Sequence, residues 1–148
     1  MTYPEFTIRV IAALLAGMVI GFERQWHHKS AGLRTTTLVS LGSAIYVLLS
    51  IGITQTSGDP TRIIGQVVTG IGFLCAGVIF KEGLSLHGLT TSVTIWCCSA
   101  VGCLAATGYY IETAIATFLI LLVNIGLKYV DNWLTNRKQE NNEDQKHY

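Results

Sequence analysis

The stretch GLSLHGLTTSVTIWCCSAVGCLAATGYYI, residues 83–111, decides the fold class of this sequence. It runs for 29 residues without an Asp, Glu, Lys or Arg, and a helix needs only about 20 mostly apolar residues to cross a bilayer. Charged residues make up 13% of the 148-residue chain, against about 25% in soluble domains. Four more charge-free windows lie at residues 10–22, 35–58, 63–80 and 113–127. The sequence therefore predicts an all-α, polytopic transmembrane helical bundle.

The windows predict five spans, at residues 6–22, 36–53, 63–80, 91–107 and 111–130. The first span is the weakest because it contains Arg9, whose long side chain can carry its charge to the membrane edge. An interfacial first helix, leaving four spans, is the alternative. Asp59 and Pro60 are typical of a helix start and open the third span. We expect residues 1–134 to form the membrane domain and residues 135–148 to form a disordered cytoplasmic tail.

The basic residues predict the orientation of the spans. Eight of the ten Lys and Arg residues fall in the first connection, in the third connection or at the C-terminal end. Basic residues near spans tend to stay in the cytoplasm. We therefore expect the N-terminus to lie outside and the C-terminus inside, in a multi-pass protein of the bacterial inner membrane.

Small residues predict how the helices pack. In lipid, helices associate through close backbone approach and through occasional polar side chains. Candidate packing positions are Gly17 and Gly21 in the first span and Gly70, Gly72 and Gly77 in the third. We expect such positions to pack inside the bundle, with homo-oligomer contacts or a permeation path as alternatives. The four cysteines lie within spans without a Cys-x-x-Cys pair and are expected to be small apolar fillers.

Catalytic motifs are missing from the sequence. It contains no phosphate-binding glycine loop, no His-Glu-x-x-His motif and no Gly-x-Ser-x-Gly motif, so we expect neither an enzyme nor a cofactor. The net charge of +1 argues against a nucleic-acid partner. The adjacent His27 and His28 are weak candidates for metal ligands, and the sequence does not identify a bound metal.

The first connection, residues 23–34, is the densest polar segment before the tail. Its simplest interpretation is a basic loop that touches the anionic head groups of the lipid bilayer. The alternative is an ordered, partly buried pair of Glu23 and Arg34, recognised by a partner or ligand.

Six short motifs, read in order, resemble the MgtC/SapB (YhiD) family of bacterial inner-membrane proteins. They are GFERQ at 21–25, AGLRT at 31–35, LVSLG at 38–42, DPTR at 59–62, GIGFLCAG at 70–77 and GLTT at 88–91. Their order and approximate spacing match from about residue 13 to residue 116. Two departures are Cys75, where the family usually has glycine, and the end of the sequence soon after the last span, without the soluble C-terminal domain of some members.

The resemblance implies adaptation to low magnesium or acid stress and, in pathogens, survival inside host cells. It also implies a regulator that restrains a membrane partner such as the F-type ATP synthase. The polar positions that it carries over are Glu23, Arg24, Gln25, Arg34, Thr35, Asp59, Arg62, Thr90 and Thr91.

Two functions follow as hypotheses. The first is a non-enzymatic membrane modulator that acts through helix contacts. The second is a transporter or channel for magnesium or another cation, using Asp59, Glu23 and Glu82. Because no span carries an interior acid, the second would need backbone carbonyls from a helix unwound at residues 70–77.

Overall fold

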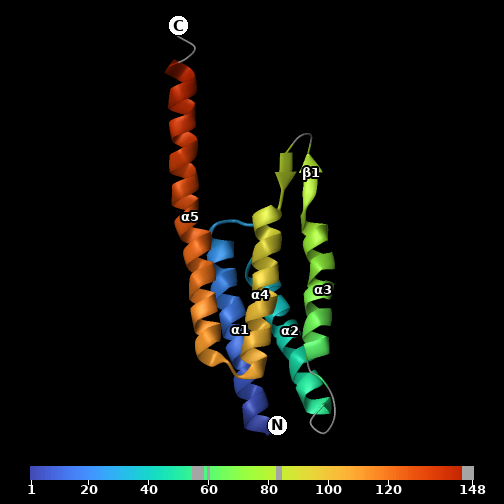
Figure 1. The fold of residues 1–148 in the computed structure, drawn as a ribbon. Coiled ribbons are helices and arrows are strands. Elements are labelled where there is room, and N and C mark those ends of the chain that lie inside the picture. The colour runs from blue at the N-terminus through green and yellow to red at the C-terminus, as the bar shows by residue number, and fades with distance from the viewer. Residues whose placement is uncertain (55–58, 60, 83–84, 145–148) are drawn as a thin grey trace.

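The computed structural model describes residues 1–54, 59, 61–82 and 85–144. Five helices and one short hairpin make up its regular structure (Figure 1). The elements are α1 (Tyr3–Trp26), α2 (Leu33–Ile53), α3 (Thr61–Val78), β1 (Phe80–Glu82), β2 (Ser85–His87), α4 (Leu89–Thr107) and α5 (Tyr110–Asp144). All five helices are long and apolar enough to cross a membrane. The predicted five-span helical bundle is therefore confirmed.

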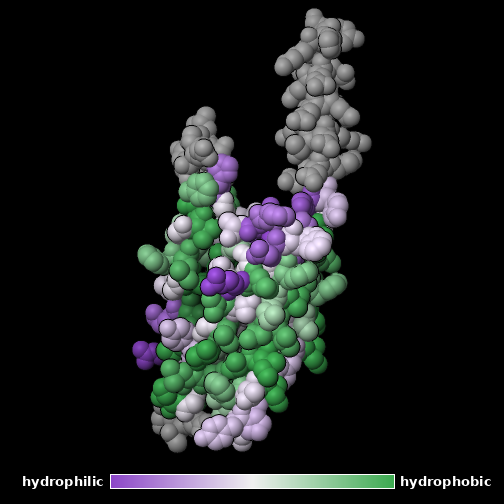
Figure 2. Space-filling view, turned by 180° about the vertical axis from the view of Figure 1, so that it is seen from behind, coloured by the Kyte–Doolittle hydropathy of each residue, from purple (hydrophilic) through white to green (hydrophobic). Residues whose placement is uncertain are grey.

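The helix with the longest uncharged stretch, α4, lies at the centre of the bundle. It contacts each of the other four helices, and 61% of its most apolar window is buried, against 6% for α3. A charge in the buried part of α4 would therefore be surrounded by other helices rather than by water. On the face that Figure 2 shows, hydrophobic residues cover most of the bundle, and a group of hydrophilic ones lies toward the end from which α5 extends.

The two ends of the bundle carry different connections. The α1–α2 connection, the hairpin and the C-terminal part of α5 lie at one end, which we call the loop-one end (Figure 1). The N-terminus, the end of α2, the start of α3 and the α4–α5 turn lie at the other, which we call the N-terminal end.

Close backbone approach joins α1, α2 and α4 around Ser40. A Cβ added to Gly17 would lie 2.8 Å from the Ser40 Cβ, and one added to Gly102 would lie 2.1 Å from the Ser40 carbonyl oxygen. At Gly21 the added atom would lie 2.1 Å from Thr36 Oγ1. Two hydroxyls bridge the same interface, because Ser40 Oγ donates to Ala13 O at 2.8 Å and Thr36 Oγ1 donates to Gly17 O at 3.0 Å. The small residues of α1 thus pack inside the chain.

The glycines of α3 lie differently. A Cβ on Gly70, Gly72 or Gly77 would meet nothing within 4 Å, so these positions are not packed against another helix of the chain. The third helix is also continuous from Thr61 to Val78. The cation hypothesis required a helix that is unwound at residues 70–77, and α3 is not unwound there.

Two helix starts can be compared with the sequence. Asp59 does cap α3, because its Oδ1 accepts from the Thr61 backbone N–H at 2.9 Å; Pro60 lies outside the described residues. The start of α4 differs: its N-cap is Gly88, with φ of +85° and no side-chain cap. The preceding hairpin, which the sequence analysis did not anticipate, turns the chain so tightly that a Cβ at Gly88 would lie 2.2 Å from the Val78 carbonyl oxygen.

The helix α5 continues to Asp144, past residue 135, where the sequence analysis placed the start of a disordered tail. Residues 127–144 contain neither glycine nor proline, and Lys, Arg, Gln and Glu are good helix formers. A polar helix can therefore extend beyond the span. The last four residues of the chain lie outside the described residues.

Arg9 in α1 is held by the end of a neighbouring helix. Its Nη1 donates to the Ala106 carbonyl oxygen at 2.9 Å, in the last turn of α4, where carbonyls lack helical partners and the helix dipole is negative. Gly108, with φ of +87°, ends α4 beside the same guanidinium. The charge inside the first span thus serves as a cap for α4.

We predict that Gly102→Ala destabilises the bundle by about 1–3 kcal/mol, because the added methyl group must push the α2 backbone away. The matched control is Gly126→Ala on α5, where the added atom would meet nothing within 4 Å. Reversible unfolding in mixed detergent micelles measures both changes. Equal stability of the two variants would contradict the tight α2–α4 contact.

Candidate functional site

Polar side chains from three helices and the first connection meet at the loop-one end. We call this group the loop-one cluster; its members are Glu23, Arg24, His27, Ser30, Thr91 and Asn124. Glu23 and Arg24 lie in the last turn of α1, Thr91 in the first turn of α4, and Asn124 in α5. The cluster therefore ties the ends of three helices to the α1–α2 connection.

Arg24 is the largest fully buried side chain of the described residues, at 2% exposure. Its Nη2 donates to Thr91 Oγ1, and Ser30 Oγ donates to the same oxygen at 3.3 Å. Its Nε has no hydrogen-bond partner among the described residues, and no described carboxylate lies within 4.0 Å of the guanidinium. A buried charge of this kind is costly, which makes Arg24 a candidate for recognition rather than for simple packing.

Glu23 is bound on both sides of its carboxylate. His27 Nδ1 lies 3.1 Å from Oε1, and Asn124 Nδ2 donates to Oε2 at 3.4 Å across to α5. The expected pair of Glu23 and Arg34 is not formed, because Arg34 is exposed and makes no ion pair with any described residue. Arg34 instead lies at the edge of a pocket between α2 and α3 and does not belong to the cluster.

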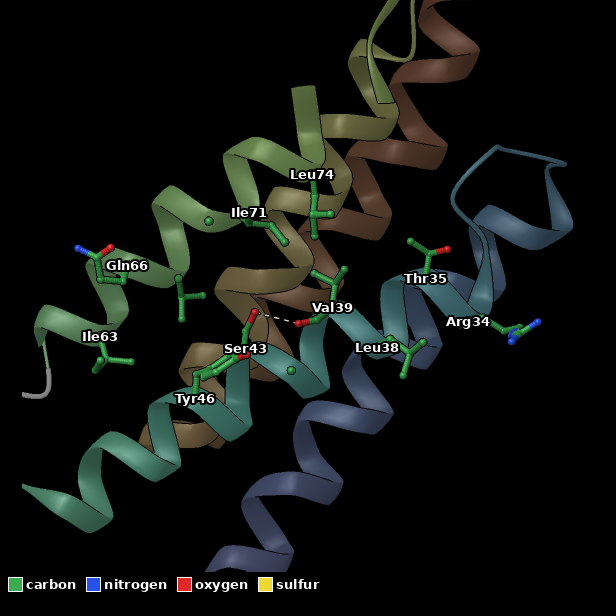
Figure 3. Close-up of a pocket in the computed structure, with 13 residues that line it drawn as sticks. Arg34, Thr35, Leu38, Val39, Ser43, Tyr46, Ile63, Gln66, Ile71 and Leu74 are labelled. Atoms are coloured by element: carbon green, nitrogen blue, oxygen red, sulfur yellow. Dashed lines mark hydrogen bonds between the residues drawn. The ribbon is translucent and has the colours of Figure 1, made fainter. Parts of the chain in front are cut away.

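Arg34 and Thr35 instead line a groove between α2 and α3, which we call the α2–α3 groove (Figure 3). The groove encloses about 860 Å³. Its middle is apolar, with Val39 on α2 facing Leu74 on α3, and Gln66 lies toward the N-terminal end. Arg34 is thus separated from the loop-one cluster and belongs to a different feature of the molecule.

Asp59 and Arg62 lie at the N-terminal end, beside a smaller hollow of about 400 Å³ that continues the groove past Gln66. Both residues are exposed. The Thr61 hydroxyl and backbone N–H donate to Asp59 and hold the pKa of its carboxyl below the ordinary value. Asp59 therefore stays charged at neutral pH as the cap of α3.

The remaining polar positions have local roles. The Gln25 side chain lies against the backbone of Gly32, where an added Cβ would be 2.1 Å from Gln25 Oε1. Thr90 is exposed, whereas its neighbour Thr91 is buried against Arg24. Within the part of the chain that the structure describes, no three His, Cys, Asp or Glu residues are placed to hold a metal ion.

The order of these features along the chain matches a known family. A profile of the MgtC family matches residues 10–133, which include the loop-one cluster and all of the five spans except the start of the first. The chain belongs to the MgtC family. It is a multi-pass membrane protein of that family, with five helices suited to span a membrane.

Proteins of several bacteria are similar to this chain over most of its length. The chain is 51% identical over 118 residues to Protein MgtC of Brucella abortus, covering 78% of this chain and 48% of the relative. It is 44% identical over 123 residues to Protein MgtC of Salmonella typhimurium, covering 83% and 52%. An uncharacterized protein of Synechocystis is 40% identical over 148 residues, covering 100% and 63%. The chain thus spans about half the length of the MgtC relatives, and no solved structure gives a significant match.

Sequence reasoning did not assign His27 and Asn124 to the site of this MgtC-family chain. Asn124 was recognisable as a polar residue within a span, which usually faces the bundle interior. Its partner could not be found from the sequence, because Glu23 lies 101 positions away. His27 was considered only for metal binding, yet the two described contacts of its ring are both with Glu23, one with the backbone carbonyl oxygen and one with the carboxylate.

We predict that Thr91→Val destabilises the protein by about 1–3 kcal/mol, because it removes the hydrogen-bond acceptor of a buried guanidinium while keeping the side-chain shape. Thr90→Val is the matched control, since the adjacent side chain is exposed and its hydroxyl makes no hydrogen bond to a described residue. Unfolding in mixed micelles compares the two. A loss of stability in Thr90→Val as large as in Thr91→Val would argue against the Arg24–Thr91 contact.

Proposed function

We propose that this chain is a non-enzymatic modulator of the bacterial inner membrane that restrains the F-type ATP synthase under magnesium limitation or acid stress. The proposal rests on membership of the MgtC family, on the role that this resemblance implies, and on one surface of α3. The loop-one end would lie in the cytoplasm, because most basic residues lie in its connections and at the C-terminal end.

The surface that carries the proposal is a row of small residues on the outer side of α3. We call it the α3 stripe; its members are Gly65, Thr69, Gly72 and Ala76. Their spacing of four, three and four residues places them within about 60° of one another on a helix. All four are exposed, and a Cβ on Gly65 or Gly72 would meet nothing within 4 Å.

The α3 stripe has the composition of a helix–helix contact without a helix of this chain against it. Within a bilayer, such small-residue rows let two backbones approach closely, and that approach supplies much of the association energy. The other sides of α3 are accounted for, because Ile71 and Cys75 pack toward α4 and Leu74 lines the α2–α3 groove. The α3 stripe is therefore the face of α3 that a transmembrane helix of the partner would bind.

The loop-one cluster would support this role by fixing the bundle. It joins α1, α4 and α5, and Ser92 of α4 in turn bonds α3 by donating from Oγ to the Cys75 carbonyl oxygen at 2.7 Å. The helix α3, which carries the α3 stripe, is thereby attached to the rest of the bundle at its loop-one end.

We expect Gly72→Leu to need an about tenfold higher protein concentration for the same inhibition of the ATP synthase. The reason is that overpacking a close contact costs about 1–3 kcal/mol. The measurement is ATP-driven proton pumping in inverted membrane vesicles, titrated with each variant at matched levels. Gly126→Leu on α5 is the control, because its added side chain also meets open space.

Wild type and Gly126→Leu should depress both proton pumping and ATP hydrolysis. Passive proton leak, measured in the same vesicles after respiration has built the gradient, must stay unchanged. Equal depression by all three proteins would remove the α3 stripe from the mechanism. No depression by wild type would overturn the ATP synthase assignment for this chain.

A further inference from the structure

We propose that the α2–α3 groove binds an anionic phospholipid, with the lipid phosphate at Arg34 and an acyl chain against the apolar residues between the two helices. This site is distinct from the α3 stripe, which lies on the opposite side of α3. The proposal therefore does not depend on the identity of a protein partner.

The groove has the size and lining of a lipid site. Its volume of about 860 Å³ lies within the range of about 300–1,000 Å³ typical of small-ligand pockets. Leu38 and Val39 of α2 and Val67 and Leu74 of α3 provide apolar walls. Because the groove lies between α2 and α3, two helices long and apolar enough to span a membrane, we place its opening in the lipid rather than in water.

The positive charge of Arg34 at one end of the groove favours an anionic lipid head group. Arg34 lies at the loop-one end of the groove (Figure 3), is exposed, and forms neither an ion pair nor a side-chain hydrogen bond with any described residue. The first turn of α2 adds to this positive field, because its N-cap, Gly32, provides no side-chain acceptor. Basic pockets between spanning helices bind the head groups of anionic lipids.

The shape of the groove favours an acyl chain over a second helix. Glycines and large side chains alternate along its walls, with Gly42 beside Tyr46 on α2 and Gly70 beside Leu74 on α3. The groove therefore changes in width along its length. A flexible hydrocarbon chain can follow such a surface, whereas a helix needs a regular row of small residues like the α3 stripe.

A bound lipid would also complete the packing of α3. Only Ile71 is buried in α3, and the described hydrogen bonds that hold this helix to the bundle join Cys75 to Ser92 of α4. An acyl chain between α2 and α3 would cover the apolar face that α2 leaves open.

The test is native mass spectrometry of the full chain in detergent, titrated with phosphatidylglycerol or with phosphatidylcholine of the same acyl composition. We expect wild type to bind phosphatidylglycerol in preference to phosphatidylcholine. Arg34→Gln should weaken phosphatidylglycerol binding by about fivefold, the contribution of one basic residue near anionic lipid, and Arg34→Lys should restore most of it. Lys29→Gln removes the same charge from the nearby α1–α2 connection without lining the groove and should bind as wild type does.

A second pair of variants tests the location. Gly70→Leu fills the middle of the groove and should abolish the preference, whereas Gly72→Leu, whose side chain points away, should keep it. Circular dichroism confirms that each variant is folded. Equal binding by Gly70→Leu and Gly72→Leu, equal losses in Arg34→Gln and Lys29→Gln, or a dimer that disappears only in Gly70→Leu would each overturn the proposal.

Discussion

The close approach of three backbones around Ser40 is the constraint on which the bundle depends. Ser40 lies where Gly17 of α1 and Gly102 of α4 both press against α2, and its hydroxyl bonds the α1 backbone. Lipid offers little hydrophobic drive between helices, so such contacts must supply the packing energy. The positions of α1, α2 and α4 follow from this junction, and α3 and α5 are added at opposite sides of it (Figure 1).

The junction also explains why charge can be buried at both ends of the bundle. With α1 and α4 held side by side, Arg9 reaches the C-terminal turn of α4 and Arg24 reaches its N-terminal turn. The first arrangement is electrostatically favourable and the second is not, because a cation gains from the carbonyl end of a helix and loses at the N–H end. Arg24 is thus retained at an energetic cost, which distinguishes it from a residue that serves stability alone.

The outer helix α3 has a different character from the junction. It presents the α3 stripe on one side and the α2–α3 groove on another, and both are open in the described chain. The two surfaces differ in chemistry, since one is a regular row of small residues and the other an irregular apolar channel with Arg34 at its end. A helix with two open faces is suited to contact components outside the chain, which is the basis of both proposals.

The sequence by itself determined the number of spans and the family. Charge-free windows identify the segments that lie in lipid, because an unpaired charge in hydrocarbon is costly wherever the helix packs. The positions of Gly17 and Gly21 and the Asp59 cap were also predictable, since each depends on local spacing. The helical part of α5 beyond residue 135 was missed because a polar composition does not by itself prevent a helix from continuing.

Only the tertiary structure decided which polar residues meet. Glu23 and Arg34 lie 11 positions apart and were expected to pair, yet Glu23 bonds Asn124 of α5 and Arg34 lines the α2–α3 groove. The same holds for small residues four positions apart, since Gly17 and Gly21 are buried in α1 whereas Gly72 and Ala76 are exposed in α3. The physical reason is that sequence periodicity fixes which residues share a face of a helix, while the packing of neighbouring helices determines what that face contacts.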